Sequence, residues 1–349
     1  MGRKKTSDLR RGWTTGACAT AAVKAGLAML WGHSRLNEVG ITLPRGEKPV
    51  FPIAFFDQGS DWVSVGITKD AGDDPDVTHG ALIVATVRSS ESGVVFKAGE
   101  GVGTVTKEGL PIGVGEPSIN PVPREMMTAE VDRAAALYLR QPNVEITVSI
   151  PGGAEIAKKT WNGRLGIIGG LSILGTTGVV RPFSCAAWIA SIHRGIDVAR
   201  AERLPHVAGC TGATSERIVQ NLHNLPEIAM LDMGDFFGGM AKYLVKHPVP
   251  RVTIGGGIGK ITKLAQGAID LHSSRSQVDF RDLQETAEAL GLSDLGACNT
   301  ALEAAERGGP LLCKAIAARA RMRVLDFLPD TEVDVIVIDR AGVVLGHAK

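Results

Sequence analysis

The chain of 349 residues is 44% hydrophobic and 21% charged, a composition typical of a globular protein with about two domains. Lysine plus arginine (38) nearly balance aspartate plus glutamate (37), which argues against nucleic acid or a membrane surface as a partner, and the 5% of aromatic residues argue against a platform for stacked bases. The sequence shows neither the apolar core of a signal peptide nor the ~18–20 apolar residues of a membrane span, so we expect a cytoplasmic protein.

The first half predicts an α+β domain. An alanine-rich helix is expected over Thr15–Leu30, where Thr14 or Thr15 can cap its start and Gly32 can end it. A second helix is expected over Pro123–Leu139, because proline is favourable in a first turn. Short strand-like runs separated by glycine, proline and aspartate predict mainly antiparallel neighbours. These runs are Gly40–Leu43, Val50–Phe56, Trp62–Thr68, Ala81–Arg88 and Val94–Ala98, and Val144–Ile150 is a further alternating strand after the second helix.

In the second half, strand-like runs alternate with helix-like runs, which predicts βαβ units in a mostly parallel, Rossmann-like sheet. The successive pairs are Gly166–Ile168 with Ser184–Ile192, Pro205–Ala208 with Ser215–Leu222, Ile228–Leu231 with Phe236–Lys246, and Val252–Ile254 with Lys260–Leu271. A largely helical stretch, Asp282–Val324, is followed by two strands, Val333–Ile338 and Gly342–Leu345. We therefore expect an α+β domain over 1–160 and an α/β domain over 161–349.

Four glycine-rich segments stand where a strand should turn into a loop or a helix. Glycine lets a ligand approach the backbone closely, and a helix start offers unpaired N–H groups at the positive end of its dipole. Such loops bind carboxylates, phosphates or nucleotides, although any α/β protein has capped tight turns of the same composition. The segments are 13–20, 169–178, 208–215 and 253–260.

The last of these segments carries the strongest prediction of a cofactor loop. Val252–Ile254 is typical of a buried strand, and a helix is expected from Lys260. The segment is not a P-loop, because Ile261 stands where a hydroxyl would follow the lysine, and no acidic residue ends a strand ~20 residues later as in a dinucleotide fingerprint. The glycines of the predicted turn are Gly255, Gly256, Gly257 and Gly259.

Side chains that could contact an anion follow this turn. Lys260 and Lys263 lie one turn apart on the predicted helix, and His272 and Ser273 come just after its end. A solvated pair of lysines and an ordinary turn are the alternative interpretations.

An aspartate-rich segment, residues 69–78, directly follows a predicted strand. Crowding raises the pKa of a carboxyl and can create a base that works near neutral pH, but the chemistry alone favours a solvated turn. The spacing lacks the glycine and the glutamate of an EF-hand loop. Cys18, near the first helix start, is either a thiol with a lowered pKa or a small residue packed among alanines. The carboxylates are those of Asp70, Asp73, Asp74 and Asp76.

Taken in order, these segments resemble the cobalt-precorrin-5B C1-methyltransferase (CbiD) family. The resemblance runs from residue 11 to about residue 276, and an ordered series of this length is more specific than any single glycine motif. The matching stretches are Arg11–Ala22 (RGWTTGACATAA), Lys69–Thr78 (KDAGDDPDVT), Gly99–Leu110 (GEGVGTVTKEGL), Gly115–Arg124 (GEPSINPVPR), Leu171–Gly178 (LSILGTTG), Gly259–Gly267 (GKITKLAQG) and His272–Ser273.

The resemblance implies transfer of a methyl group from S-adenosylmethionine to C1 of cobalt-precorrin-5B in cobalamin synthesis. A partly built corrin ring carries acetate and propionate arms, which suit many N–H donors, and its own carbon is the nucleophile. The resemblance also implies that cobalt arrives chelated by the substrate. We expect no metal site in the protein, because its five cysteines and eight histidines show no metal-site spacing.

The resemblance further implies roles for three groups of residues. The candidates for a carboxylate that steers proton transfer around C1 are Asp70, Asp73 and Asp74. The candidate loops for S-adenosylmethionine are, first, Gly255, Gly256, Gly257 and Gly259, and second, Gly175 and Thr176. The candidates for contacting the corrinoid substrate are Thr14, Thr15, Gly16, Lys260, Lys263, His272 and Ser273.

Two rival functions stay open at this stage. A small-molecule kinase would use the same glycine loops for phosphates, and a non-catalytic tetrapyrrole-binding protein would hold the ring without methylating it. The sequence also leaves open whether the ring already carries cobalt and whether the chain forms a homo-oligomer.

Overall fold

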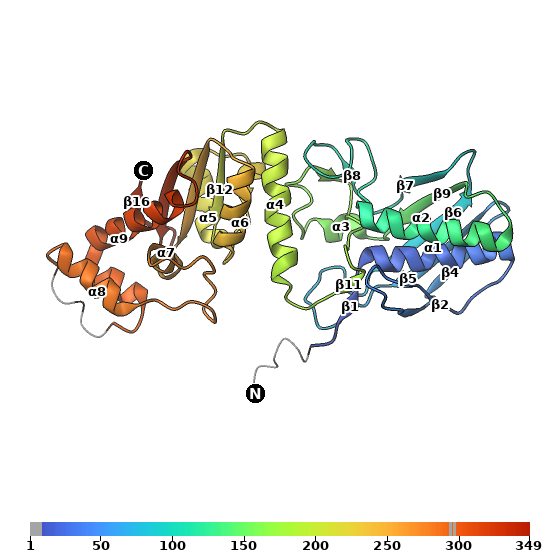
Figure 1. Cartoon of the computed structure of the whole chain (residues 1–349), viewed down its shortest axis with the longest axis horizontal. Coiled ribbons are helices and arrows are strands. Elements are labelled where there is room, and N and C mark those ends of the chain that lie inside the picture. Colours follow the sequence, from blue (N-terminus) through green and yellow to red (C-terminus); the bar gives the residue numbers. More distant parts are fainter. Residues whose placement is uncertain (1–8, 293–294, 296–297) are drawn as a thin grey trace. The chain divides into compact units, whose positions relative to one another are not determined.

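The computed structural model describes residues 9–292, 295 and 298–349, and it divides into two compact units, Met1–Ser184 (unit 1) and Cys185–Lys349 (unit 2) (Figure 1). The division falls later than the predicted boundary at residue 160. The reason is that two short strands beyond that point pair with unit 1: β10 (Ile167–Ile168) with β8, and β11 (Val179–Val180) with β1. The prediction that residues 166–168 begin the parallel sheet is therefore wrong.

Unit 1 combines helices with a five-stranded sheet. Its other elements, in chain order, are β1 (Gly12–Trp13), α1 (Thr15–Gly32), β2 (Glu38–Gly40), β3 (Val50–Pro52), β4 (Phe55–Gln58), β5 (Trp62–Thr68), β6 (Leu82–Ser89), β7 (Val94–Ala98), β8 (Thr104–Val105), α2 (Pro121–Tyr138), β9 (Val144–Ser149) and α3 (Gly153–Ala157). Helix α1 begins after the Thr14 cap and ends at Gly32. His33 follows in a left-handed conformation, so that its N–H donates to Met29 O and the Ser34 N–H to Ala28 O.

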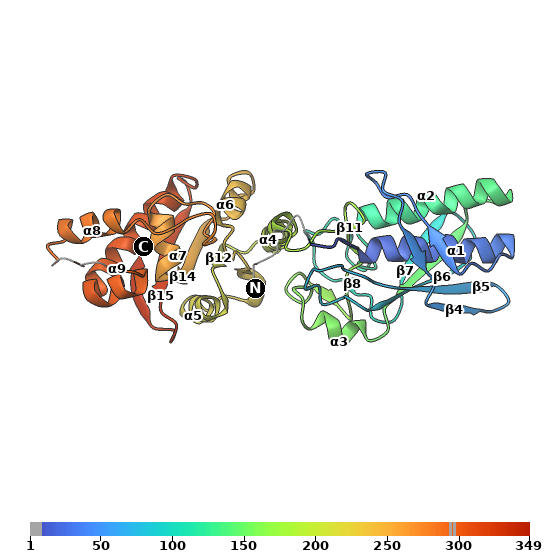
Figure 2. The same cartoon turned by 90° about the horizontal axis from the view of Figure 1, so that it is seen from below.

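The main sheet of unit 1 has the strand order β4-β5-β6-β9-β7. The pairs β4–β5 and β5–β6 are antiparallel, as predicted for neighbouring runs. The pair β6–β9 is also antiparallel, but β7 pairs with β9 in parallel. The antiparallel prediction is wrong for β7 because β9 occupies the free edge of β6, so β7 joins the far side of β9. Helices α1 and α2 lie side by side over one face of this sheet, and buried residues of β5, β6 and β9 form the core with them (Figures 1 and 2).

Unit 2 alternates helices and strands. Its elements are α4 (Cys185–Ala201), β12 (His206–Cys210), α5 (Ala213–His223), a 3-10 turn η2 (Glu227–Ala229), β13 (Met230–Leu231), α6 (Phe237–Lys246), β14 (Arg251–Gly257), α7 (Ile258–Ala265), α8 (Phe280–Ala289), α9 (Ala301–Leu325), β15 (Glu332–Ile338) and β16 (Val344–Ala348). The strand order is β13-β12-β14-β15-β16, in which only the last pair is antiparallel.

The two faces of this sheet are covered unequally. Alternate residues of β15 (Val333, Val335 and Val337) join a large core with α4, α6, α7 and α9. The residues between them point to the other face, where Ile336 and Ile338 pack with Val219 of α5 (Figures 1 and 2). Any polar side chain of β15 or a neighbouring strand that points to this second face is therefore covered by helix α5 alone.

Candidate functional site

Three loops of unit 1 that are far apart in the sequence meet at the start of α1. They comprise residues 10–16, 69–79 and 174–183, and we call them the three-loop joint. The Trp13 N–H donates to Asp70 O at 2.7 Å, the Thr14 N–H to Gly178 O at 3.0 Å, and the Gly16 N–H to Leu174 O at 3.1 Å. The structure thus brings together the aspartate-rich segment, the Thr-Thr-Gly loop and the second candidate loop for the methyl donor.

The Thr-Thr-Gly loop does not form the open N–H cradle that its composition predicts. Thr14 and Thr15 are buried, the Thr14 hydroxyl accepts the Ala17 N–H at 3.2 Å, and the Thr15 hydroxyl accepts the Leu174 N–H at 3.0 Å. Gly16 is glycine because a Cβ there would lie 2.6 Å from Pro123. The polar groups of this loop form hydrogen bonds that hold the three loops together, so the structure does not support their predicted role in binding the substrate.

The second candidate loop, at Gly175 and Thr176, packs against the same cap. Gly175 has φ +131°, and a Cβ there would lie 2.3 Å from the Thr14 hydroxyl oxygen, so the glycine permits close packing and leaves no room for a ligand. The neighbouring Thr176 is exposed and lies at the surface of the joint.

Asp70 has the opposite electrostatics to those predicted for a base. Both of its carboxylate oxygens accept hydrogen bonds from the Arg10 guanidinium, and one also accepts the Gly72 N–H at 2.9 Å. Hydrogen bonding to Arg10, then to the Gly72 N–H, lowers the pKa of Asp70 to about 2, although partial burial works against the shift. The expectation of a raised pKa is wrong for Asp70. It considered only the neighbouring carboxylates, whereas the decisive charge is that of Arg10, 60 positions away in the sequence.

The other aspartates also fasten the loop. Asp73 accepts the Arg10 N–H at 2.9 Å, and Asp74 accepts the Phe183 N–H at 2.8 Å. Phe183 is exposed and has φ +55°, a left-handed conformation that costs a bulky residue energy and that the Asp74 contact helps to hold. Asp74 therefore positions an exposed ring at the surface of the joint.

Residues that sequence reasoning missed lie on the exposed side of the joint. Strand β1 pairs with β11 in a register that places Gly12 opposite Val180, so Arg11 and Arg181 directly flank the last pair of this ladder. Both arginines are exposed, and neither pairs with an acidic group among the residues that the structure describes. Like charges beside each other destabilise a strand pair, so this arrangement favours an anion. Both lie close to matched segments in the sequence, since Arg11 is the first residue of one and Arg181 stands three positions after the end of another.

In unit 2, the carboxyl ends of the parallel strands form a second candidate site. The order β13-β12-β14-β15 reverses between β12 and β14, and open α/β sheets bind ligands beside such a reversal. Helix α5 starts after Gly212 and α7 starts after Gly257, and neither start has a side-chain cap. A Cβ at Gly212 would meet nothing within 4 Å, and one at Gly257 only Ile338 O at 4.0 Å. These two helix starts are accessible to a ligand.

The predicted glycine turn at 255–259 is therefore only partly correct. Gly255, Gly256 and Gly257 belong to β14 and pair with Ile336 to Ile338 of β15. A Cβ at Gly255 would lie 2.5 Å from Val219, and one at Gly256 2.8 Å from Thr211, so these two glycines serve packing. Gly257 and Gly259 remain as backbone that a ligand can approach.

The predicted anion-binding side chains have other partners. The Lys260 ammonium lies 3.0 Å from Asp235 and donates to Thr211 O at 3.0 Å, so it bridges three strand ends. Lys263 is buried and donates to Leu271 O at 3.0 Å, which is a structural role. His272 and Ser273 are exposed, with the His272 ring hydrogen-bonded to Ser274 at 2.7 Å. The structure does not gather these four residues around one ligand.

The structure reveals an acidic residue that fits a nucleotide. Asp232 follows β13 directly, 20 residues after Gly212, which is the spacing at which dinucleotide-binding folds place the acid for a ribose hydroxyl. The loop at 253–260 is not followed by an acid at the end of a strand ~20 residues later, whereas the loop at 208–215 is. This spacing is visible in the sequence.

Cys18 has no reactive thiol. It is fully buried in α1, and burial raises its pKa to about 12, with the Lys69 charge opposing the shift. The alternative of a small residue packed among alanines is therefore correct.

No helix of the described residues is both long and apolar enough to cross a membrane.

Residues 2–182 match the CbiD family, and residues 270–349 match its C-terminal domain. The chain therefore belongs to the CbiD family.

Its relatives include proteins named cobalt-precorrin-5B C(1)-methyltransferase. One from Paramagnetospirillum magneticum is 55% identical and covers 97% of this chain and 98% of its own length. One from Brucella anthropi is 54% identical over 99% and 97% of the two chains, and one from Brucella canis 56% identical over 98% and 96%. A crystal structure titled cobalamin biosynthesis protein (cbiD) from Archaeoglobus fulgidus is 27% identical, covers 76% of this chain and 83% of its own, and superposes with a TM-score of 0.42.

Proposed function

We propose that the protein transfers a methyl group from S-adenosylmethionine to C1 of cobalt-precorrin-5B in cobalamin biosynthesis. The observation that carries the proposal is a relative of that name at 55% identity over nearly the full length of both chains. At this identity the loops described above lie within a continuous match rather than in isolated motifs.

Unit 2 is proposed to bind the methyl donor as a Rossmann-like unit. The reversal of strand order between β12 and β14, the two open helix starts and the acid after β13 support this placement. The N–H groups after Gly212 and Gly257 would hold the carboxylate of the donor, and Asp232 would hold its ribose hydroxyls. When bound, S-adenosylmethionine supplies a methyl carbon made electrophilic by the adjacent sulfonium.

Unit 1 is proposed to hold the substrate on the exposed side of the three-loop joint. Arg11 and Arg181 offer charge-assisted hydrogen bonds to carboxylate arms, while exposed Leu174 and Phe183 offer apolar contact to the ring. This assignment replaces the buried Thr-Thr-Gly loop with residues of the same three loops that remain accessible.

The chemistry asks for alignment more than for a reactive side chain. The ring carbon supplies the electron pair, so the protein has to orient it and exclude water, an effect worth up to ~7–11 kcal/mol of barrier lowering. Of the three aspartates, Asp73 and Asp74 remain candidates for steering a proton around C1. Asp70 does not, because its lowered pKa keeps it ionised and its oxygens are bound to Arg10.

The test separates donor binding from substrate binding. Gly257→Val and Gly212→Val place a side chain where the protein itself leaves room, so we expect each to weaken S-adenosylmethionine binding at least ~10-fold by calorimetry while the fold is kept. Gly163→Val, also at a position with nothing within 4 Å of the new Cβ, is the matched control. Equal affinity in all four proteins would remove the donor from this sheet edge.

Turnover is scored by the mass of one added methyl group on a precorrin-5-level substrate. Arg11→Ala and Arg181→Ala are expected to raise KM for the corrinoid ~10-fold or more and to leave donor affinity unchanged, because hydrogen bonds to charged groups contribute ~1.5–3 kcal/mol. Tight corrinoid binding without any methyl transfer in the wild-type protein would favour a tetrapyrrole carrier instead.

A further inference from the structure

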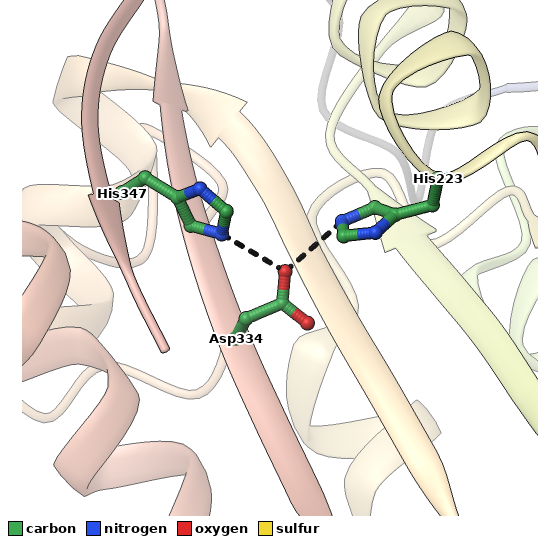
Figure 3. A group of neighbouring side chains, drawn as sticks. All are labelled: His223, Asp334 and His347. Atoms are coloured by element: carbon green, nitrogen blue, oxygen red, sulfur yellow. Dashed lines mark hydrogen bonds and ion pairs between the residues drawn. The ribbon is translucent and has the colours of Figure 1, made fainter.

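Unit 2 contains a histidine–aspartate cluster near the amino ends of its parallel strands, and the proposed donor site lies at their carboxyl ends. Asp334 interrupts the apolar run of β15 and is 2% exposed. It points to the sheet face covered by α5, where the last residue of that helix, His223, and His347 of β16 approach it from two sides (Figure 3). His223 lies more than a hundred positions before Asp334 and His347 in the chain, which is why the spacing of histidines in the sequence does not reveal the cluster.

The three side chains have the geometry of a ligand set. His223 Nε2 and His347 Nε2 each lie 3.1 Å from the same oxygen, Asp334 Oδ2, and the ligand atoms of all three lie within 4.8 Å of one another (Figure 3). Atoms bound to one zinc ion at ~2.0–2.2 Å are separated by ~3.0–3.4 Å, so little movement is needed. The His223 side chain is 10% exposed, and its Nε2 is buried. Although Nε2 lies 3.1 Å from Asp334 Oδ2, the contact does not have the geometry of a hydrogen bond. A buried nitrogen without a directed partner is costly unless something else binds it.

A second layer of side chains orients the carboxylate. The Thr253 hydroxyl donates to Asp334 Oδ1 at 2.7 Å, and His206 Nε2 lies 2.7 Å from the same hydroxyl. Since Thr253 gives its proton to the carboxylate, His206 donates to Thr253. Arg251 lies 3.4 Å from Oδ1, so its charge is on the side of the carboxylate away from Oδ2. Such outer hydrogen bonds are typical of the partners that fix metal-binding carboxylates.

We propose that His223, Asp334 and His347 bind one divalent transition-metal ion of the zinc type. Two imidazoles and one carboxylate suit Zn²⁺, Co²⁺, Ni²⁺ or Fe²⁺, whereas Mg²⁺ and Ca²⁺ prefer oxygen ligands. The ion would tie the end of α5 and the edge strand β16 to β15. Because the cluster lies at the amino ends of the parallel strands, away from Gly212 and Gly257, its role is to stabilise unit 2 and not to take part in methyl transfer. This proposal departs from the expectation, drawn from the sequence, that the protein has no metal site.

The experiment titrates the full-length, chelator-treated protein with Zn²⁺ in a buffer that does not bind metals. We expect one equivalent to bind, Co²⁺ to give the visible absorption of a site with nitrogen ligands, and the melting temperature to rise by ~5–10 °C at 100-fold excess over Kd. His223→Gln and His347→Gln should each weaken Zn²⁺ binding at least ~10-fold. His33→Asn removes an exposed histidine in unit 1 and keeps a residue that tolerates the left-handed backbone there, so it should bind like the wild type.

The proposal is overturned if the wild type binds no Zn²⁺ at micromolar concentration, since the cluster would then be a hydrogen-bond network only. It is also overturned if both glutamine variants bind as the wild type does, because the ion would then sit elsewhere. Circular dichroism establishes that each variant is folded. Should one glutamine variant fail to fold, the other variant and the cobalt spectrum of the wild type still decide the question. Loss of methyl transfer plays no part in the readout, so the result stands apart from the proposed enzymatic function.

Discussion

Replacing Asp76 by alanine is expected to destabilise unit 1 strongly, because it leaves a buried ammonium without its counter-charge. Lys69 is 2% exposed, and its ammonium forms an ion pair with Asp76 and donates to the Thr78 hydroxyl at 2.8 Å. Asp76 in turn accepts the Thr78 N–H at 2.8 Å. This cluster shapes the aspartate-rich segment that the three-loop joint depends on.

The loss of stability depends on which member of the ion pair, Lys69 or Asp76, remains after the substitution. Removing one member of a buried ion pair costs ~3–5 kcal/mol, and the lower end applies because the Asp76 side chain is 25% exposed. At ~2–4 °C per kcal/mol for a unit of this size, Asp76→Ala should lower the melting temperature by ~6–12 °C. Lys69→Met should cost only ~1 kcal/mol, because Asp76 keeps both hydrogen bonds from Thr78 and part of its hydration. The double variant should recover most of the loss caused by Asp76→Ala.

The assay is urea unfolding followed by tryptophan fluorescence, which reports mainly on unit 1. Four of the five tryptophans lie there, namely Trp13, Trp31, Trp62 and Trp161. Asp132→Ala, at an exposed position on α2, is the matched control and should change stability by less than ~0.5 kcal/mol. If Lys69→Met proves as harmful as Asp76→Ala, or Asp76→Ala as harmless as the control, the reasoning about the buried ammonium is wrong.

The pH dependence gives a second check. The pKa of Asp76 is lowered: burial raises it, but the Lys69 charge and the hydrogen bonds from Lys69 and Thr78 outweigh burial. A carboxyl whose pKa is lower in the folded state contributes stability that is complete above its unfolded pKa of ~3.9 and is lost as the pH falls through the folded value. The stability difference between wild type and Asp76→Ala should therefore shrink as the pH is lowered below ~4, and a constant difference would contradict this origin.

Three further predictions concern the joint and the thiols. Asp70→Asn should leave the shape of the pH–rate profile unchanged, because a pKa of about 2 puts the titration of Asp70 below the working range; a lost limb would make it the base after all. Asp74→Ala should raise KM for the corrinoid ~5–10-fold, because Phe183 loses the contact that holds its backbone, and a KM equal to that of the wild type would exclude the positioning role. Phe183→Gly should raise the free energy of unfolding in urea by ~1 kcal/mol, because glycine adopts the left-handed backbone conformation without strain. A thiol reagent should label the native protein at the half-buried Cys185 and Cys298 and spare the buried Cys18, Cys210 and Cys313, as counted by intact mass. Labelling of all five cysteines would show that the cores of the units open readily.

Elements with strong local signals were predictable from the sequence. The strands Trp62–Thr68 and Val94–Ala98 have the predicted bounds, and α1 begins at the predicted threonine, because alternation and capping are read from neighbouring residues. The partner of a strand was less predictable. The parallel pairing of β7 with β9 depends on which edge is free after the hairpin has formed, and that is a property of the whole sheet.

The candidate site was predicted as a set of segments and not as a set of side chains. The aspartate-rich segment, the Thr-Thr-Gly loop and the loop at 174–178 do meet. However, most of the residues predicted to bind or react instead hold the loops together, and the accessible arginines Arg11 and Arg181 are not among the predicted residues. The sequence does not show whether the hydrogen-bonding groups of a polar residue are used within the fold or remain available to a ligand.

The sequence by itself determined the family, the two-part organisation and the segments that carry function, since these depend on residue identity in order along the chain. Only the tertiary structure decided that Asp70 is an ionised anchor, that Gly255 and Gly256 serve packing, and that His223, Asp334 and His347 form one cluster. The physical reason is that burial, electrostatic shifts and ligand geometry depend on distances of a few ångströms in space, while the residues that set them can lie far apart in the chain, as Arg10 and Asp70 do at 60 positions.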